Sequence, residues 1–339
     1  MRSGYRMGMR LRRSDPAQPG LTRRGHGRGF VYRDADGKRI TDPETLERIR
    51  ALAIPPAWKD VWICPYPNGH LQAMGTDDAG RRQYLYHDDW RTTQDADKHD
   101  RVRRLARRLP AFRKAVDRDL CRKGISRERV LAVALRMLDH GVFRTGNTEY
   151  AEEHGSRGAA TLLRDDVQVR DGKLVFDFVA KGGVERVIEL SDDHLVEAVS
   201  SLKRARHGKP QLLVYRDRDG WHEIDATMIN ERFQELVGDD FTVKDLRTWT
   251  ATVHAAVDLA QADLPATKKA VKEMFADVAD HLGNTPAVAR SSYVDPRVVT
   301  QYEQGRTVAA AVRKRGNDLD DQKTRLALER SVARLLAEG

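Results

Sequence analysis

The spacing of hydrophobic residues changes character along the chain. Between residues 28 and 90, short apolar runs at 30–32, 61–63, 71–74 and 82–86 alternate with turns of the Asp-Gly and Asn-Gly type. Such turns tolerate positive φ angles and suit antiparallel hairpins. The pattern therefore predicts a small antiparallel sheet, with a short helix over residues 43–52 and a hairpin that joins 30–32 to 38–40.

Beyond residue 97 the apolar positions recur at helical spacing instead. A stripe between residues 102 and 109 lies opposite a row of arginines and predicts a helix that Pro110 ends or kinks. A stronger helical pattern covers residues 126–140, and Gly141 is placed to terminate that helix. The remainder is predicted to be mostly helical, with three strands at 167–170, 174–179 and 184–190.

These patterns predict an α+β protein in which a small antiparallel β-sheet domain precedes a larger, mostly α-helical domain that carries a three-stranded β-hairpin sheet. The expected divisions are a basic disordered tail over 1–26, the β-sheet domain over 27–95, a hinge or linker over 96–104 and the α-rich domain over 105–339. The amphipathic pattern over 306–338 predicts a C-terminal helix and indicates no function.

Charge points to a polyanionic partner, and its distribution limits that inference. The chain has a net charge of +9, a pI of about 9.6 and a mean hydropathy of −0.64. Residues 1–29 hold eight arginines and one acidic residue, so most of the excess charge belongs to the tail. Cys64 and Cys121 do not form a metal-site spacing, and no run of apolar residues could span a bilayer. We expect free thiols and a cytoplasmic protein.

Four segments carry candidate chemistry. They contain an arginine after the helix of 126–140 (Arg144), a lysine at a Gly-rich hairpin tip (Lys181), a Lys-Asp-Leu-Arg sequence (ending at Arg247), and a Leu-Gly-Asn sequence followed by a tyrosine (Asn284 and Tyr293). Each segment alone has an ordinary structural explanation, such as a helix cap, an exposed turn or a packed ring. Walker-type phosphate loops, His-Glu-x-x-His and Gly-x-Ser-x-Gly are absent from the sequence.

Together, and in this order, the four segments resemble the catalytic domain of the type IB DNA topoisomerases of bacteria and poxviruses. The resemblance spans roughly residues 27–300 and implies that Tyr293 is the nucleophile, Arg144 and Arg247 hold the scissile phosphate, and Lys181 is the general acid. At the position of Asn284 many relatives have histidine. Asparagine donates a hydrogen bond but does not titrate, so this residue is expected to stabilise the transition state.

The resemblance also implies DNA contacts. Gln83, Tyr84 and Tyr86 would touch base edges or the backbone, and Tyr150 would contact a phosphate near the scissile one. His281 precedes Asn284 by one helical turn; it is a candidate substitute donor, although a structural surface histidine is the simpler interpretation.

A covalent phosphotyrosine retains the energy of the broken phosphodiester, so religation needs no ATP. Two permanently charged guanidinium groups suit the charge of the transition state without a metal. The resemblance thus implies a monomer that clamps double-stranded DNA and relaxes positive and negative supercoils through a 3′-phosphotyrosyl intermediate. No cofactor, membrane or obligate protein partner is expected, and the enzyme would be associated with the nucleoid.

Two other functions remain open at this point. A tyrosine recombinase shares the catalytic plan, and the nine-residue spacing from Asn284 to Tyr293 fits it equally. Recombinases, however, usually have His-x-Leu-Arg where this chain has Lys244 to Arg247, and a helical N-terminal domain. A non-catalytic nucleoid or DNA-binding protein would explain the basic tail but not the complete set of reactive residues.

Overall fold

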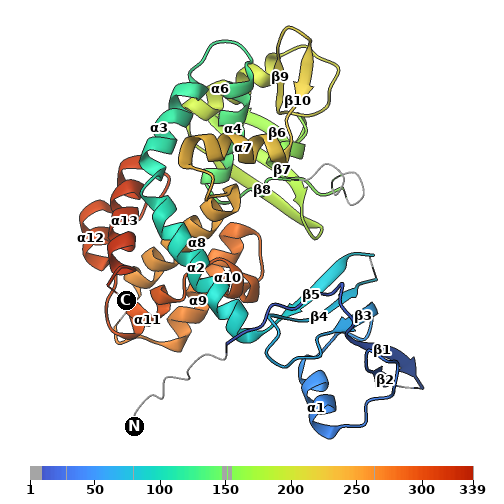
Figure 1. Cartoon of the computed structure of the whole chain (residues 1–339). Coiled ribbons are helices and arrows are strands. Elements are labelled where there is room, and N and C mark those ends of the chain that lie inside the picture. Colours follow the sequence, from blue (N-terminus) through green and yellow to red (C-terminus); the bar gives the residue numbers. More distant parts are fainter. Residues whose placement is uncertain are drawn as a thin grey trace. The chain divides into compact units, whose positions relative to one another are not determined.

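The computed structural model describes residues 10–27, 29–78, 80–146, 151, 155–262 and 264–338, without the side chains of 92, 95 and 96. The chain forms two compact units, Met1–Lys98 and His99–Gly339, and the boundary falls within a continuous helix, α2 (Asp88–Ala106). The expected hinge over 96–104 is thus part of a helix (Figure 1). Among the described residues, no helix is long and apolar enough to cross a membrane.

The first unit is built on a five-stranded antiparallel sheet with the strand order β2-β1-β3-β4-β5. Its strands are β1 (Leu21–His26), β2 (Gly29–Arg33), β3 (Lys59–Ile63), β4 (Leu71–Thr76) and β5 (Arg82–Tyr86). Cross-strand neighbours Ile63, Ala73 and Leu85 lie on the core side of the sheet. Because side chains alternate along a strand, Tyr84 faces the opposite side. The predicted antiparallel sheet is confirmed.

Helix α1 (Pro43–Ala51) packs Ile49 into the small core of this unit. Asp42 caps the helix by accepting a hydrogen bond from the amide of Thr45 at 2.8 Å, and Pro43 occupies the first turn, where no amide donor is needed. The predicted helix over 43–52 is confirmed. Strand β2, by contrast, pairs mainly with β1, and its expected hairpin partner contributes a single bridge, from Arg33 to Arg39.

The prediction of a disordered tail over 1–26 is wrong for its second half. Residues 21–26 form β1, and Leu21 is buried. Upstream, the amide of Arg12 donates to the carbonyl of Asn68 at 2.9 Å, and the hydroxyl of Ser14 donates to the carbonyl of Leu71 at 2.9 Å. Hydrogen bonds, most of them involving main-chain atoms, hold this segment, and such bonds leave no hydrophobic periodicity in the sequence.

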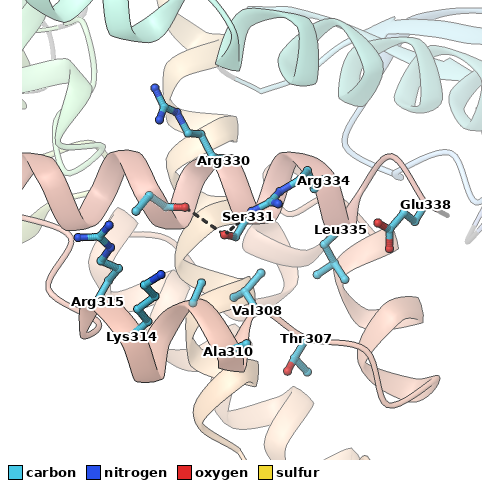
Figure 2. A pocket seen from close by; sticks show the side chains of 12 residues that line it. Thr307, Val308, Ala310, Lys314, Arg315, Arg330, Ser331, Arg334, Leu335 and Glu338 are labelled. Atoms are coloured by element: carbon cyan, nitrogen blue, oxygen red, sulfur yellow. Dashed lines mark hydrogen bonds between the residues drawn. The ribbon is translucent and has the colours of Figure 1, made fainter.

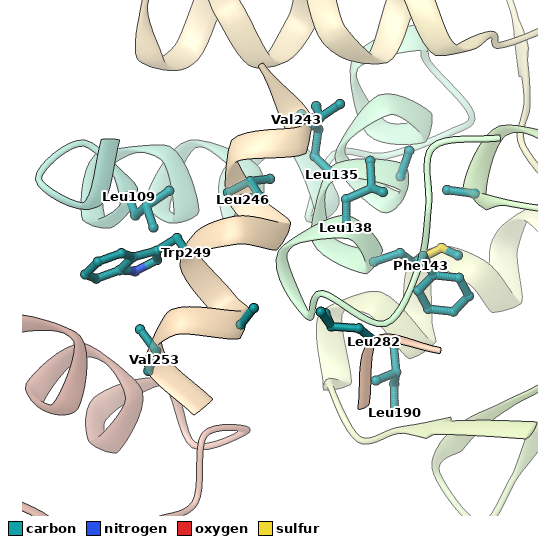
Figure 3. Close-up of a cluster of buried hydrophobic side chains, with 14 of the residues drawn as sticks. Leu109, Leu135, Leu138, Phe143, Leu190, Val243, Leu246, Trp249, Val253 and Leu282 are labelled. Carbon is teal, nitrogen blue, oxygen red and sulfur yellow. The ribbon is translucent and has the colours of Figure 1, made fainter. Parts of the chain in front are cut away.

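The second unit is mostly helical. After α2 the described residues form the helices α3 (Leu109–Leu120), α4 (Arg127–Asp139), α6 (Asp193–Arg204), α7 (Ala226–Val237), α8 (Val243–Gln261), α9 (Lys268–Leu282), α10 (Pro286–Ser292), α11 (Arg297–Glu303), α12 (Ala309–Arg315) and α13 (Gln322–Leu335), with a short 3₁₀ turn, η1 (Ala159–Thr161). Helices α4 and α8 are buried along most of their length. Their side chains, including Trp249 of α8, pack in the core with Phe143, which follows α4 (Figure 3).

Helix α4 begins and ends where the sequence predicts. The hydroxyl of Ser126 caps its first turn by accepting from the amide of Arg129 at 3.3 Å. Gly141 then adopts a positive φ of 80°, and a Cβ atom there would lie 2.7 Å from the Thr250 side chain. Only glycine fits this position, so the chain turns away from α4 at a defined point.

The sheets of this unit confirm the predicted strands and include a hairpin that was not predicted. The three expected strands form an antiparallel sheet of β6 (Val167–Arg170), β7 (Lys173–Ala180) and β8 (Val184–Leu190). The prediction of a mostly helical remainder is confirmed, but β9 (Val214–Arg216) and β10 (Trp221–Glu223) pair as a short hairpin that was not predicted. Three-residue strands are too short to show alternation.

The C-terminal segment is two helices, not one. Helices α12 and α13 pack against each other, with a basic groove of about 510 Å³ between them (Figure 2). Gly316 follows α12 with a positive φ of 82°, which interrupts the helical pattern. The two cysteines are free thiols, Cys64 buried and Cys121 exposed.

Candidate active site

Tyr293 is fixed at the end of helix α10. Its side chain is only 7% exposed. Its amide donates to the carbonyl of Ala289 at 3.1 Å, and its carbonyl accepts from the hydroxyl of Thr252 on α8 at 3.3 Å. The backbone of the expected nucleophile is therefore held from both its own helix and the central helix of the core.

Arg247 lies beside this tyrosine. Its guanidinium carbon is 5.3 Å from the centre of the Tyr293 ring. The side chain is buried on α8 and donates to the carbonyls of Gly141 at 2.6 Å, of Phe143 at 3.3 Å, and of Leu282. Arg247 thus ties the segment after α4 to the end of α9.

Burial, followed by the nearby charge of Arg144, lowers the pKa of Arg247 to about 10. At neutral pH the group still carries its charge. The direction of the shift shows that its surroundings stabilise the cation poorly. An anion entering the site would reverse that balance.

Arg144 and Asn284 meet from two different segments. Arg144 follows the end of α4, and its Nη2 donates to the Oδ1 of Asn284. Asn284 follows Gly283, which ends α9 in the left-handed conformation at a φ of 60°. The Nδ2 of Asn284 is buried and has no hydrogen-bond partner among the described residues. It is a donor available to a bound oxygen atom.

The charges around Tyr293 favour its phenolate. Burial raises the pKa of the phenol, but Arg247 and Arg144 outweigh it, with a smaller contribution from Lys244, so that the pKa of Tyr293 lies below its usual value. A lower pKa makes the phenolate more accessible near neutral pH, which suits a nucleophile.

Lys181 lies on a separate element. It is exposed in the turn between β7 and β8, where the amide of Gly183 donates to the carbonyl of Ala180 at 3.1 Å. The same hairpin reaches the end of α9 through Arg186, which donates to the carbonyls of Asp280 at 2.7 Å and His281 at 3.0 Å. Four of the five predicted reactive residues therefore meet, and the fifth is carried by a hairpin anchored next to them.

The expected DNA contacts are divided between the two faces of β5. Tyr84 and Tyr86 are 42% and 38% exposed, and their rings stack with centres 6.3 Å apart. Gln83 points to the other face and donates to the carboxylate of Asp77 at 2.9 Å. Tyr150 lies outside the described residues.

Two side chains at the site were missed from the sequence. Lys244, one helical turn before Arg247, acts on Tyr293, and it stands in the Lys-Asp-Leu-Arg sequence already singled out. Arg186 falls on the same face of β8 as the buried Ile188 and Leu190, so a cation stands at an apolar position of the strand. That signal was present in the sequence and was not used. The simpler interpretation of His281 as a surface residue is wrong, because it is mostly buried and its Nε2 donates to the carbonyl of His140 at 3.1 Å.

Comparisons with known proteins agree with this site. Residues 29–77 match the model of the bacterial DNA topoisomerase IB N-terminal domain, and residues 87–318 match the model of the eukaryotic DNA topoisomerase I catalytic core. DNA topoisomerase 1B of Acanthamoeba polyphaga mimivirus is 29% identical over 294 residues, which cover 84% of this chain and 88% of that protein. DNA topoisomerase I of Monkeypox virus is 24% identical over 293 residues, covering 79% and 87% respectively.

A solved structure of the XerH site-specific recombinase, bound to a palindromic difH substrate after cleavage, is 15% identical, with a TM-score of 0.34 over 59% of this chain and 50% of that one. A similarity this weak carries no argument. The catalytic-core model alone covers more than half of the chain and includes all five predicted reactive residues. The chain therefore belongs to the type IB DNA topoisomerases, isomerases that act on DNA.

Proposed function

We propose that this enzyme relaxes positive and negative supercoils by cutting and resealing one strand of duplex DNA through Tyr293. The observation that carries the proposal is the position of the Tyr293 ring, buried against Arg247 and within the field of Arg144, with its pKa lowered. Such an environment favours attack by the phenolate on an anionic phosphodiester.

In the cleavage step the Tyr293 oxygen attacks phosphorus, and the bond from phosphorus to the 5′ oxygen breaks. Lys181 gives a proton to the departing 5′ oxygen, so the products are a 3′-phosphotyrosyl enzyme and a free 5′ hydroxyl. Resealing is the reverse: the 5′ hydroxyl attacks phosphorus, returns its proton to the lysine, and releases the tyrosine. One phosphodiester replaces another in each direction, so no ATP is consumed.

Arg144, Arg247 and Asn284 would stabilise the charge that gathers on the non-bridging oxygens. Two guanidinium groups supply two positive charges in a fixed geometry, and the Nδ2 of Asn284 adds a neutral donor. These groups provide the charge stabilisation that a metal ion would otherwise supply. The proposal therefore includes activity without added metal.

A direct test is relaxation of a supercoiled plasmid in EDTA without ATP, with Tyr293→Phe as the matched variant. We expect the wild type to relax DNA of either sign and the variant to leave it supercoiled. Relaxation by both proteins would remove Tyr293 from its role. Binding without relaxation, together with joining of two DNA sites, would favour a tyrosine recombinase.

We also propose that a single copy of the chain acts on one duplex, and that the exposed face of β5 binds it. All five reactive groups come from one chain, and the stacked rings of Tyr84 and Tyr86 present an aromatic surface. Tyr84→Ala should weaken binding to duplex DNA by about tenfold, measured by fluorescence anisotropy. Tyr66→Ala, another exposed tyrosine of the same unit, is the control and should leave affinity unchanged.

A further inference from the structure

Three consecutive carbonyl groups at the end of helix α4 are each bound by a side chain from a different helix. Arg325 of α13 donates to the carbonyl of Asp139 at 2.7 Å, His281 of α9 to that of His140 at 3.1 Å, and Arg247 of α8 to that of Gly141 at 2.6 Å. The last carbonyls of a helix have no N–H donor within the helix, so donors from outside must satisfy them. Here those donors also fix the direction in which the chain leaves the helix.

The segment fixed in this way carries Arg144, three residues beyond Gly141. On the other side of the contact, His281 belongs to the last turn of α9, three residues before Asn284. The hydrogen bond from His281 to His140 therefore joins the same two segments that Arg144 and Asn284 join at the site. The bond between Arg144 and Asn284 lies in the site, and the bond between His281 and His140 lies outside it.

The chemistry of the His281 contact is defined by its acceptor. A carbonyl oxygen only accepts, so the Nε2 of His281 carries the proton. Burial lowers the pKa of His281 to about 4, partly offset by the bond to His140, and the ring of His254 packs against it with centres 4.0 Å apart. Neutral imidazole with its proton on Nε2 is thus the form present at physiological pH, and the bond is permanent there.

Arg325, the neighbouring donor, has the support of helix α13. Its Nε donates to Glu329 at 3.1 Å, and Glu329 in turn accepts from Arg113 at 2.7 and 2.8 Å. By helical spacing, Arg325 and Glu329 lie on one face of α13. Arg330 and Arg334, which line the groove in Figure 2, lie on the opposite face. The end of α4 is therefore held on one side by α13. On the other side His281 links it to the segment of Asn284, next to Arg247, which binds Gly141 and Leu282.

We infer that His281 is a positioning residue for DNA cleavage, which holds Arg144 in register with Asn284 through the carbonyl of His140. The inference rests on the proposed function, because it assumes that Arg144 acts on the scissile phosphate. His281 itself does not touch the reacting atoms. A displacement of the arginine by about 1 Å slows a reaction by up to about a hundredfold.

The test compares His281→Gln with His281→Asn in single-turnover cleavage of a DNA duplex, with DNA affinity measured in parallel. Both replacements are neutral amides. Glutamine places its nitrogen where the Nε2 of histidine lies, whereas asparagine places it where Nδ1 lies. We expect His281→Asn to cleave at least about tenfold more slowly with unchanged affinity, and His281→Gln to restore most of the rate. His222→Asn, an exposed histidine on the β9–β10 hairpin, should cleave at the wild-type rate.

A double-mutant cycle with Arg144→Ala separates positioning from general stability. If His281 acts through Arg144, His281→Asn should not slow the Arg144→Ala enzyme any further. A slowing that multiplies in the two backgrounds overturns the inference, as does wild-type cleavage by His281→Asn or failure of His281→Gln to restore the rate. Tyr293→Phe, measured alongside, distinguishes an error in this inference from an error in the proposed function. Cleavage by that variant would exclude Tyr293 as the nucleophile.

Discussion

The second unit contains two groups of arginines, buried except for the half-buried Arg144, whose partners differ in kind. In one, Arg113 and Arg325 are paired with the carboxylates of Asp139 and Glu329. In the other, Arg247 donates to main-chain carbonyls and Arg144 to the amide oxygen of Asn284. We call the first the paired cluster and the second the reacting cluster.

Their pKa values diverge accordingly. In the paired cluster burial opposes the charge of Arg113, but Asp139 and Glu329 outweigh it and raise its pKa above the usual value. In the reacting cluster burial and Arg144 lower the pKa of Arg247 to about 10. A protein that buries cations without carboxylates leaves their charge available to something else. The phosphodiester of DNA is the anion that would complete the reacting cluster.

The largest expected effect is on the reacting cluster. Arg247→Ala should slow single-turnover cleavage by about a thousandfold, because a buried guanidinium aimed at the transition state is lost. The same change removes a poorly stabilised charge from the folded protein. We therefore expect only a small fall in the unfolding midpoint beside the large loss of cleavage rate. Arg247→Lys keeps the charge but not the two-pronged geometry and should stay well below the wild type. Near-normal cleavage by Arg247→Ala would make the two clusters functionally alike.

The second prediction reverses the pattern at the paired cluster. Glu329→Gln leaves two buried arginines with one carboxylate and should cost about 3 kcal/mol of stability, read from chemical denaturation. Cleavage per folded molecule should change far less than in Arg247→Ala. Glu235→Gln is the control, since Glu235 is an exposed partner of Arg232 and its loss should cost under about 1 kcal/mol. A large rate loss with little loss of stability would assign the paired cluster to catalysis.

A third prediction concerns a cation that belongs to neither cluster. Lys181 is exposed on its hairpin, so its proposed role is proton donation and not fixed charge stabilisation. Lys181→Ala should slow cleavage by about a hundredfold on ordinary DNA. On DNA with sulfur in place of the departing 5′ oxygen the loss should largely disappear, because a thiolate leaves without a proton. Lys173→Ala, on the same sheet, should be normal on both. An equal loss on both substrates would contradict the acid role.

The residues of the reacting cluster could be predicted from the sequence, for identifiable reasons. Arg144, Arg247, Asn284 and Tyr293 each follow a helix end or occupy a helix, and helical spacing together with Gly141 marks those ends. The chain order of the residues then carried the resemblance to a family. Most regular elements of both units could be predicted from their apolar periodicity, whereas β1, β9 and β10 are short or lack that periodicity and were missed.

The paired cluster could not be predicted in this way. Arg113, Asp139 and Glu329 stand on three helices far apart in sequence, and charged residues within an amphipathic pattern normally lie on the solvent side. Only tertiary packing turns them inward. The same limit applies to His281, whose acceptor is a main-chain carbonyl 141 positions away, and to residues 10–20, which are held by main-chain bonds without an apolar signature.

The smallest expected effect comes from a buried charge of the opposite sign. Asp258 of α8 is mostly buried, and burial, followed by the nearby Asp277, raises the pKa of its carboxyl to about 7. Among the described residues no cation contributes to its pKa, so it shares with Arg247 the lack of a partner of opposite charge, but an anion would repel DNA. Its folded pKa lies above the unfolded value of about 3.9. The carboxyl therefore destabilises the fold progressively as pH rises from about 4, and the effect levels off above about 7.

Asp258→Asn mimics the protonated form and should stabilise the protein by on the order of 2 kcal/mol at pH 8, after discounting for partial exposure. The gain should shrink at pH 5 and vanish near pH 3, and cleavage at pH 7.5 should be unchanged. Unfolding midpoints across this range check the prediction, with the exposed Asp240→Asn as the control. A gain in stability that does not change with pH would mean that the pKa of Asp258 is not raised. A gain that shrinks at low pH would separate two consequences of burying an unpaired charge: transition-state stabilisation by the arginines, and a cost to stability from this aspartate.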